Sequence, residues 1–375
     1  MATATITRSV LAAALARLDK GVLHRSPREI TQCLYLSING EFVLACNDLE
    51  SIGIESVSSV QKNGEASTCV NAKQLRKIVT TSKEKELEVS IDDGKITVAG
   101  ATLQGQDCKE FPSVSIPAES SAKQTVWIEG KRLANMLDYC SLACDVDSTR
   151  SALIGCSIEM LEGDNLRVVG TDGYRLHVAE TGEFTSQESA ILHQSHCERL
   201  SSAARKCDRV ELRIHENRIV AICYLRGEIV TSLVFRAIEC RYPAWRQVVP
   251  SESDYRITIR GDLLQLAAER IANFHGRKSE VPHAIVSVKN GSDIQMTGKK
   301  DTGDNMIQTV PVAYGSGDRD SISLQLNAFY LADAVPAGAD LVCFSGVYRK
   351  HCTPVKIETT IGAVRFVGLV MPCLK

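Results

Sequence analysis

The feature that most constrains this chain is an internal repeat, because three stretches present the same order of elements at a period of roughly 120–130 residues. Each copy opens with a short apolar strand that leads into an amphipathic helix with apolar residues at i, i+3, i+4 and i+7. These helix positions are Val10, Leu11, Ala14, Leu15 and Leu18, then Leu133, Met136, Leu137 and Cys140, and finally Leu263, Leu264, Ala267, Ala268 and Ile271. One domain repeated three times predicts an arch or part of a ring, since equivalent surfaces line up on one side.

The rest of each copy follows one plan. Strands with an acidic turn come next, then a second helix from about Ala72, Cys197 or Asn327, then more strands. The acidic turns are Asn47-Asp48-Leu49, Thr171-Asp172-Gly173 and Lys300-Asp301-Thr302, and the copies close on Phe111-Pro112, Tyr242-Pro243 and Met371-Pro372. Strand pairs joined by short turns predict antiparallel sheets with two helices per copy on one face, so the fold class is α+β. We place three domains at residues 1–123, 124–253 and 254–375.

Composition is typical of a soluble globular protein. The 375 residues are 44% hydrophobic and 23% charged. No apolar run approaches the ~20 residues that span a bilayer. The N-terminal sequence has no basic segment followed by an apolar one, which a secretory signal would show. We therefore expect a cytoplasmic protein without a membrane partner.

The fourteen cysteines do not indicate a metal or catalytic site. No C-x-x-C pair occurs, and the His-Cys pairs at 196–197 and 351–352 have no second pair at zinc-ligand spacing. Most cysteines alternate with Val, Ile or Leu, as small buried hydrophobes do in a reducing compartment. The sequence also lacks a phosphate loop, a G-x-G-x-x-G, a nucleophile elbow and an H-E-x-x-H motif. We predict no enzyme activity, no cofactor and no metal.

Basic residues gather on two equivalent second helices, although the net charge is −2. An overall acidic protein can in this way present one basic face, whereas a solvated helix face is the ordinary alternative. The third copy has no base between residues 326 and 339. The principal basic positions are Lys73, Arg76 and Lys77 in the first copy and Arg199, Arg205 and Lys206 in the second.

The segment from Gly170 to Val178 resembles the bacterial sliding clamp, the beta subunit of DNA polymerase III. That family carries a Thr-Asp-Gly-His/Tyr-Arg-Leu motif in its middle domain, as residues 171–176 do here. Residues 241–250 and 370–375 are similar to the family's Arg-Phe-Pro-Asp-Tyr-Arg-Arg-Val-Leu-Pro and to its terminal Val-Met-Pro-Met-Arg-Leu. Asp48-Leu49-Glu50 matches a further signature, so the resemblance covers the whole length.

The resemblance implies a non-catalytic processivity factor. Two chains would join head to tail into a six-domain ring, with helices lining a hole that holds double-stranded DNA without reading its sequence. Arg25 lies next to a DNA-contacting position of the family and would join the six basic residues above. By alignment, Leu103 and Phe274 would fall at the dimer interface, where Asn273 replaces a second apolar residue of the family.

The resemblance also implies a pocket for a short peptide motif of DNA polymerase and clamp-loader subunits. One arginine of the family's pocket is replaced by Gln247 in this chain. Arg175 is expected to pair with Asp172 or another acid, and three of the apolar positions (Leu153, Leu176 and Val370) can equally be core residues. The implied pocket residues are Leu153, Thr171, Gly173, Tyr174, Arg175, Leu176, Pro243, Gln247, Val248, Asn327, Tyr330, Val370, Met371, Pro372, Cys373 and Leu374.

The sequence therefore predicts a DNA sliding clamp that tethers polymerase. The chief alternative is a protein-binding scaffold built from the same repeats that never encircles DNA. A thiol-dependent hydrolase is a third class, but it would need a reactive low-pKa thiol activated by a nearby histidine, and no local motif supplies one. Basic charge on equivalent helices favours the clamp.

Overall fold

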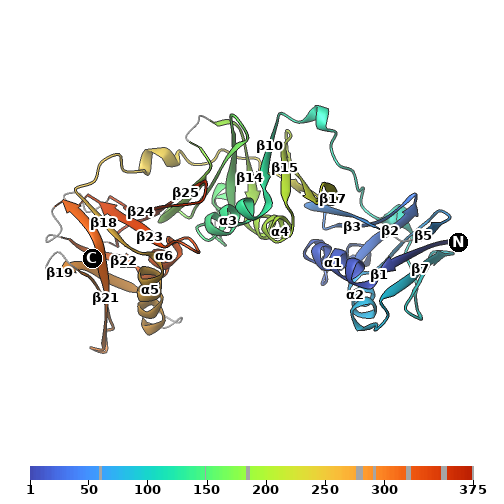
Figure 1. The fold of residues 1–375 in the computed structure, drawn as a ribbon, viewed down its shortest axis with the longest axis horizontal. Helices are drawn as coiled ribbons and strands as arrows, with labels where there is room; N and C mark the ends of the chain where they lie inside the picture. The colour runs from blue at the N-terminus through green and yellow to red at the C-terminus, as the bar shows by residue number, and fades with distance from the viewer. Residues whose placement is uncertain are drawn as a thin grey trace. The chain divides into compact units, whose positions relative to one another are not determined.

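The computed structural model repeats one order of elements three times: a strand, a helix, a group of strands, a second helix and three more strands (Figure 1). It describes residues 1–58, 61–147, 149–182, 186–275, 282–289, 293–317, 322–347 and 353–373. The predicted repeat is therefore present. The second helix of the middle copy begins at Gln194, a few residues before the predicted start at Cys197.

The elements of each copy have the following bounds. The first contains β1 (Ala2–Thr7), α1 (Arg8–Leu18), β2 (Cys33–Asn39), β3 (Glu41–Asn47), β4 (Ser51–Val57), β5 (Gln61–Asn63), β6 (Ala66–Asn71), α2 (Ala72–Thr81), β7 (Glu86–Asp92), β8 (Lys95–Val98) and β9 (Ala101–Leu103). The second contains β10 (Gln124–Glu129), α3 (Gly130–Ser141), β11 (Gly155–Leu161), β12 (Asn165–Thr171), β13 (Arg175–Glu180), β14 (Ser186–His193), α4 (Gln194–Ala204), β15 (Arg209–Ile214), β16 (Arg218–Leu225) and β17 (Glu228–Arg236). The third contains β18 (Tyr255–Arg260), α5 (Gly261–His275), β19 (His283–Lys289), β20 (Asp293–Lys299), β21 (Asn305–Gly317), β22 (Ser323–Asn327), α6 (Ala328–Asp333), β23 (Leu341–Gly346), β24 (Val355–Ile361) and β25 (Val364–Val370).

Local sequence explains why these segments take their form. The side chain of Asn71 caps α2 by accepting a hydrogen bond from the backbone N–H of Gln74 (3.1 Å), which satisfies a donor that the helix cannot. The buried residues of α2 are Ala72, Leu75 and Val79, which lie on one face. Strands such as β1 and β18 alternate between buried and more exposed residues, as expected for sheets with one covered face.

The chain forms two compact units. Unit 1 comprises Met1–Ala134 and Glu198–Ala237, and unit 2 comprises Asn135–Cys197 and Ile238–Lys375. Unit 1 holds a five-stranded sheet, in the order β5-β1-β7-β8-β9, and an eight-stranded sheet, β10-β15-β16-β17-β4-β3-β2-β6. Unit 2 holds a twelve-stranded sheet in the order β14-β11-β12-β13-β25-β24-β23-β18-β21-β20-β19-β22. The named pairings are antiparallel, and the α+β class is confirmed.

Each unit has an apolar core under its helices. In unit 1, residues from α1 and α2 pack with residues of strands β1 to β3, β7 and β8. In unit 2, residues from α5 and α6 pack with residues of strands from β18 to β25. Among the described residues, no helix has both the length and the apolar character needed to cross a membrane.

The largest sheet of each unit runs from one copy of the repeat into the next. The last strand of copy two, β17, pairs with β4 of copy one, and β25 of copy three pairs with β13 of copy two. Phe235 faces Ser51 in the first pairing, and Val370 faces Arg175 in the second. Consecutive copies are thus joined by continuous backbone hydrogen bonding. The division into domains 1–123, 124–253 and 254–375 remains our proposal.

Candidate functional site

The turn between β12 and β13 in unit 2, residues 171–175, is held by two side chains. The Asp172 carboxylate accepts hydrogen bonds from the backbone N–H groups of Tyr174 (2.8 Å) and Arg175 (2.9 Å). The Thr171 hydroxyl donates to the carbonyl of Arg175 (2.6 Å) and accepts from the N–H of Gly173 (3.1 Å). Gly173 has φ +93°, which a residue without a Cβ adopts at little cost. The motif therefore builds a rigid turn.

Arg175 connects this turn to α6. Its guanidinium donates to Asp172 (3.0 Å) and to Asp333 (2.5 Å), and it lies over the Tyr330 ring, 4.2 Å from the centroid. The expected pairing of Arg175 with Asp172 is present. Asp333 is a partner that the sequence did not single out, because the spacing along α6 does not say which acid meets a distant arginine.

Burial shapes the electrostatics of this corner. It raises the pKa of the Asp333 carboxyl, although Arg175 opposes the shift. Burial and the nearby negative charge of Asp172 raise the pKa of the Tyr330 hydroxyl. The Asn327 carboxamide caps α6 by accepting from the N–H groups of Phe329 (2.9 Å) and Tyr330 (3.4 Å), so its oxygen is already engaged.

The segment after β25 lies between the turn and β22. The N–H of Met371 donates to the carbonyl of Tyr174 (2.9 Å), and the N–H of Cys373 donates to the carbonyl of Gln325 (2.8 Å). Pro372 forms an isolated bridge with Leu326. Leu374, the last predicted pocket residue, lies outside the described residues. The structure thus brings the middle motif and the C-terminal motif together.

The third motif packs on the neighbouring sheet face. Leu176 belongs to a buried cluster with four residues of β12, β13 and β25, and Tyr242, Trp245 and Val249 pack against it. Between these three residues, Pro243, Gln247 and Val248 are exposed. The 171–175 turn, these three residues and Met371–Cys373 make up the predicted peptide-binding surface, which we call the unit 2 groove.

Not all of the predicted apolar lining is accessible. Leu153, Leu176 and Val370 are buried, and Val370 belongs to the core of unit 2. The alternative that they are core residues therefore describes their packing. The accessible apolar surface comes instead from Val248, which is 53% exposed, and from the half-buried Met371 and Pro372.

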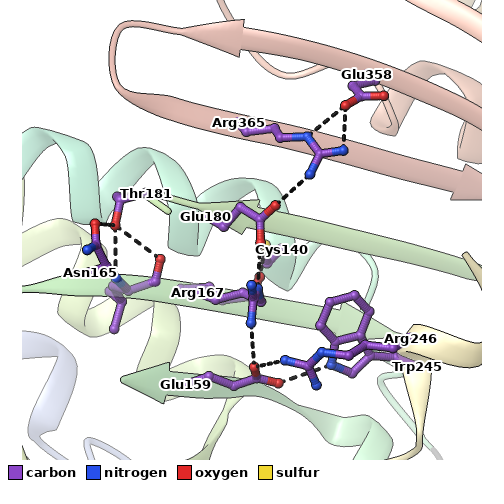
Figure 2. Close-up of polar contacts among 12 residues, drawn as sticks. Cys140, Glu159, Asn165, Arg167, Glu180, Thr181, Trp245, Arg246, Glu358 and Arg365 are labelled. Atoms are coloured by element: carbon purple, nitrogen blue, oxygen red, sulfur yellow. Dashed lines mark hydrogen bonds and ion pairs between the residues drawn. The ribbon is translucent and has the colours of Figure 1, made fainter. Parts of the chain in front are cut away.

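A ladder of alternating charges crosses this sheet beside the groove (Figure 2). Arg167 on β12 binds Glu159 on β11 (3.2 Å) and Glu180 on β13 (2.6 Å). Arg365 on β25 binds Glu180 (2.8 Å) and Glu358 on β24 (2.6 Å). The charge ladder therefore links copy two to copy three.

The segment that contains Pro243 is hydrogen-bonded to the same charge ladder. Trp245 donates its indole N–H to Glu159 (3.0 Å), and Arg246 binds the other oxygen of that carboxylate (2.6 Å) (Figure 2). A cavity of about 270 Å³ lies here, lined by both residues, by three valines and by members of the ladder. This anchoring sets the place of Gln247 and Val248 at the rim of the groove.

The predicted DNA-contacting residues divide by exposure. Lys73 and Lys77 are exposed on α2, and Arg76 is half buried in an ion pair with Asp19. Arg25 is exposed in the segment after α1. Arg205 and Lys206 are exposed just beyond the end of α4.

Arg199 departs from the expectation. Its side chain is 3% exposed, and its guanidinium donates to the Ser51 hydroxyl and to Cys46 Sγ (3.0 Å) and lies 3.8 Å from the Asp48 carboxylate. A buried cation with these partners is not available to phosphates. We therefore remove Arg199 from the candidate DNA surface.

The two predicted interface residues lie in different units. Leu103 is half buried in β9, the last strand of the five-stranded sheet. Phe274 is half buried near the end of α5, and Lys300 Nζ lies 4.3 Å from the centroid of its ring. Phe274 is therefore close to the turn that leads into β21.

No metal centre is present in the part of the chain that the structure describes: it contains no cluster of three or more His, Cys, Asp or Glu side chains suited to an ion. The described cysteines are free thiols and most are buried. Burial raises the pKa of Cys46 and Cys140, which makes these thiols poor nucleophiles at neutral pH.

Comparison with known proteins shows which proteins the chain is similar to. No protein-family model matches the sequence. The beta sliding clamp of Caulobacter vibrioides is 24% identical over 350 residues, which cover 88% of both chains. That of Synechococcus elongatus is 22% identical over 335 residues, or 86% of this chain and 85% of the other. The chain is thus similar in sequence to beta sliding clamps over most of its length.

Structure comparison supports the same fold. The DNA polymerase III subunit beta of Pseudomonas aeruginosa, a sliding clamp solved bound to griselimycin, superimposes with a TM-score of 0.86 at 20% identity. The match covers 100% of each chain. The sliding-clamp fold predicted from the three motifs is thus confirmed over the full length.

Proposed function

We propose that this protein is a DNA sliding clamp, a non-catalytic ring that encircles duplex DNA in the cytoplasm and tethers replicative polymerase and other clamp-binding proteins. The observation that carries the proposal is the strand pairing that joins consecutive copies of the repeat. The same pairing, made between two molecules, produces a closed ring.

Two joints of this kind are formed within the chain. In each, the last strand of one copy pairs with the fourth strand of the copy before it, as β17 does with β4 and β25 does with β13. The remaining last strand is β9, and among the described residues it pairs only with β8. The remaining acceptor is β21, whose residues 305–311 pair with β20 alone in the described chain. A second copy would satisfy both edges.

The two edges suit each other chemically. Ile307 on this half of β21 is 52% exposed, and Leu103 on β9 is half buried. Pairing would bury both side chains and would complete the backbone hydrogen bonds of two open strands. Because each molecule offers one edge of each kind, the interface is head to tail, and two copies with three domains each would close it.

Sedimentation velocity tests the ring. Leu103→Ala combined with Phe274→Ala should shift the protein from dimer towards monomer at micromolar concentration. Val10→Ala combined with Leu225→Ala removes exposed apolar groups elsewhere and should leave the dimer unchanged. A wild-type protein that is monomeric at this concentration would refute the closed ring.

Phosphate contact would come from exposed bases of unit 1. Lys73, Lys77 and Lys206 are exposed, and such contacts neutralise phosphates without reading bases, which allows sliding. The protein should remain on nicked circular DNA after loading and leave when the circle is cut. Changing the three lysines to alanine should shorten retention in a strongly salt-dependent way, whereas Lys62→Ala with Lys95→Ala should not.

The unit 2 groove would receive the short peptide motif of a polymerase or a loader subunit. Exposed Val248 and half-buried Met371 and Pro372 offer apolar contact, and Tyr174 stands at the rim with 67% exposure. An extended peptide with two or three apolar anchors fits such a surface.

A further inference from the structure

Unit 1 contains a hollow at the place in the repeat that the unit 2 groove occupies in unit 2. Its volume is about 430 Å³, within the range of small-ligand and peptide pockets. Its walls are the turn between β3 and β4, the ends of β16 and β17, and residues 112–115, which follow the first copy. We call it the unit 1 groove.

The turns of the two grooves have equivalent hydrogen bonds. Asp48 accepts from the N–H groups of Glu50 (3.1 Å) and Ser51 (2.6 Å), as Asp172 does from the two residues at equivalent distance in its own turn. The Asn47 side chain accepts from the N–H of Leu49 (2.8 Å), as the Thr171 hydroxyl does from Gly173. Leu49 also has positive φ, at +76°.

The neighbouring strand ends correspond as well. The N–H of Arg236 donates to the carbonyl of Glu50 (2.9 Å), and the N–H of Met371 donates to the carbonyl of Tyr174 (2.9 Å). Arg236 therefore occupies in unit 1 the position that Met371 occupies in the unit 2 groove.

The third wall is equivalent in the same way. Pro112 follows an aromatic residue, as Pro243 does, and the carbonyl of the next residue, Ser113, accepts from Asn47 Nδ2 (2.9 Å). Val114 packs against a buried cluster that includes Ile52 and Val234, whereas the corresponding Trp245 packs against Leu176 and its neighbours. The segment after each copy is thus laid across the sheet face in both units.

The two grooves differ in their accessible side chains. Leu49 stands where unit 2 has Gly173, and it is 54% exposed despite its apolar side chain. Arg218 and Arg236 line the hollow together with a single acid, Glu50, which is 3.8 Å from Arg236 in an exposed pair. The rim therefore carries an excess of positive charge beside an exposed apolar residue.

We propose that the unit 1 groove is a second peptide-binding site, which takes an extended segment with an apolar residue against Leu49 and Pro112 and an acidic residue towards Arg218 and Arg236. The inference rests on the proposed peptide binding in the unit 2 groove, because the equivalence of the two is its main support. It adds a site at the other joint of the repeat, with its own preference for acidic peptides.

The test counts sites on the full-length protein. The probe is a fluorescein-labelled hexapeptide with two leucines, a phenylalanine and an aspartate, followed by fluorescence anisotropy and calorimetric titration. Leu49→Asp removes the apolar contact, and aspartate tolerates positive φ better than most residues, so the variant should fold. Val248→Asp is the matched change in the unit 2 groove. Thermal melting of each variant reports on folding.

We expect two probe molecules per chain in the wild type, one in each single variant and none in the double variant. Arg236→Glu should weaken the unit 1 site at least tenfold for the aspartate probe and should strengthen a probe that carries lysine instead. One site per chain that only Val248→Asp removes would overturn the second site and leave the proposed function intact. One site that only Leu49→Asp removes would instead refute peptide binding at the unit 2 groove.

Discussion

The turns of the two grooves have the same pattern of backbone hydrogen bonds, but a different arginine pairs with the aspartate in each. Both hold an aspartate that accepts two backbone N–H groups, Asp48 in unit 1 and Asp172 in unit 2. In unit 2 the cation is Arg175, from the turn itself, and in unit 1 it is the buried Arg199, from α4. The aspartate therefore fixes the turn, whereas the side chain that balances its charge can come from a different element.

A second difference follows two residues further along each strand. Gly53 in unit 1 stands where unit 2 has His177, since Gly53 faces Leu233 and His177 faces Gly368 in the equivalent pairings. A Cβ on Gly53 would lie 2.3 Å from the Arg199 guanidinium. One joint thus leaves room for a buried arginine, and the other fills the space with a buried histidine.

The largest expected effect concerns His177 and pH. Its Nδ1–H donates to the carbonyl of Tyr139 (2.8 Å), and burial, with Arg175 nearby, lowers its pKa from 6.5 to about 3. The unfolded chain therefore binds a proton that the folded chain does not, so stability is lost as pH falls from about 6.5 to about 3, by about 4–5 kcal/mol in total. Hydrogen exchange against pH should show unit 2 losing protection before unit 1. His177→Gln should reduce this dependence, and an unchanged slope would contradict the assignment.

The next effect distinguishes a structural role of Arg199 from a role in DNA contact. Arg199→Ala leaves the Asp48 carboxylate, whose side chain is 14% exposed, without its buried cation, so we expect unit 1 to lose about 3–5 kcal/mol of unfolding free energy. Chemical denaturation measures it. Arg175→Ala is the matched change, and it should cost unit 2 a similar amount because the nearly buried Asp172 carboxylate loses its cation. A stable Arg199→Ala protein with weakened DNA retention would restore Arg199 to the DNA surface.

Truncation should distinguish the two grooves with a smaller effect. Deleting Met371–Lys375 removes the hydrogen bond to Tyr174 and one wall of the unit 2 groove, so peptide affinity there should fall tenfold or more, while retention on circular DNA persists. The unit 1 groove should keep its affinity, since its equivalent segment lies within the chain. If calorimetric titration shows the same affinity and the same number of sites after truncation, partners bind elsewhere.

The smallest effect is expected at the rim. Gln247 is exposed, so Gln247→Arg should strengthen the binding of peptides with acidic flanks by up to about 1 kcal/mol. Gln247→Met serves as a control of similar size without the charge. Equal gains from both variants in the same titration would assign the effect to packing.

Much of this architecture could be predicted because it depends on local sequence patterns. Helix periodicity placed the first helix of each copy, the order of the repeat placed the second, and the aspartate turns at 47–49 and 171–173 proved equivalent down to their hydrogen bonds. The third turn is closed differently, with the N–H of Gly303 donating to the carbonyl of Lys300 (3.0 Å).

What the sequence could not show are pairings between distant residues. Arg199 looked like one base among several on a helix, and only its approach to Ser51 and Asp48 in another copy reveals that it is buried. Likewise, Val370 follows an apolar pattern that suits a pocket and a core equally. Its place in the core depends on α5 and α6, which the local pattern does not locate.

The charge ladder of Figure 2 bears on how a chain of look-alike parts avoids assembling wrongly. Because the last strands of the three copies hold equivalent places in the repeat, each could pair with a wrong acceptor strand during folding. In the place of β25, strand β17 would set Val230 against Glu180 instead of Arg365, so this nearly buried carboxylate would keep Arg167 but lose the second of its two arginine partners. The charge ladder thus favours pairing of β13 with β25 over pairing with another last strand. It therefore disfavours strand-swapped products during folding.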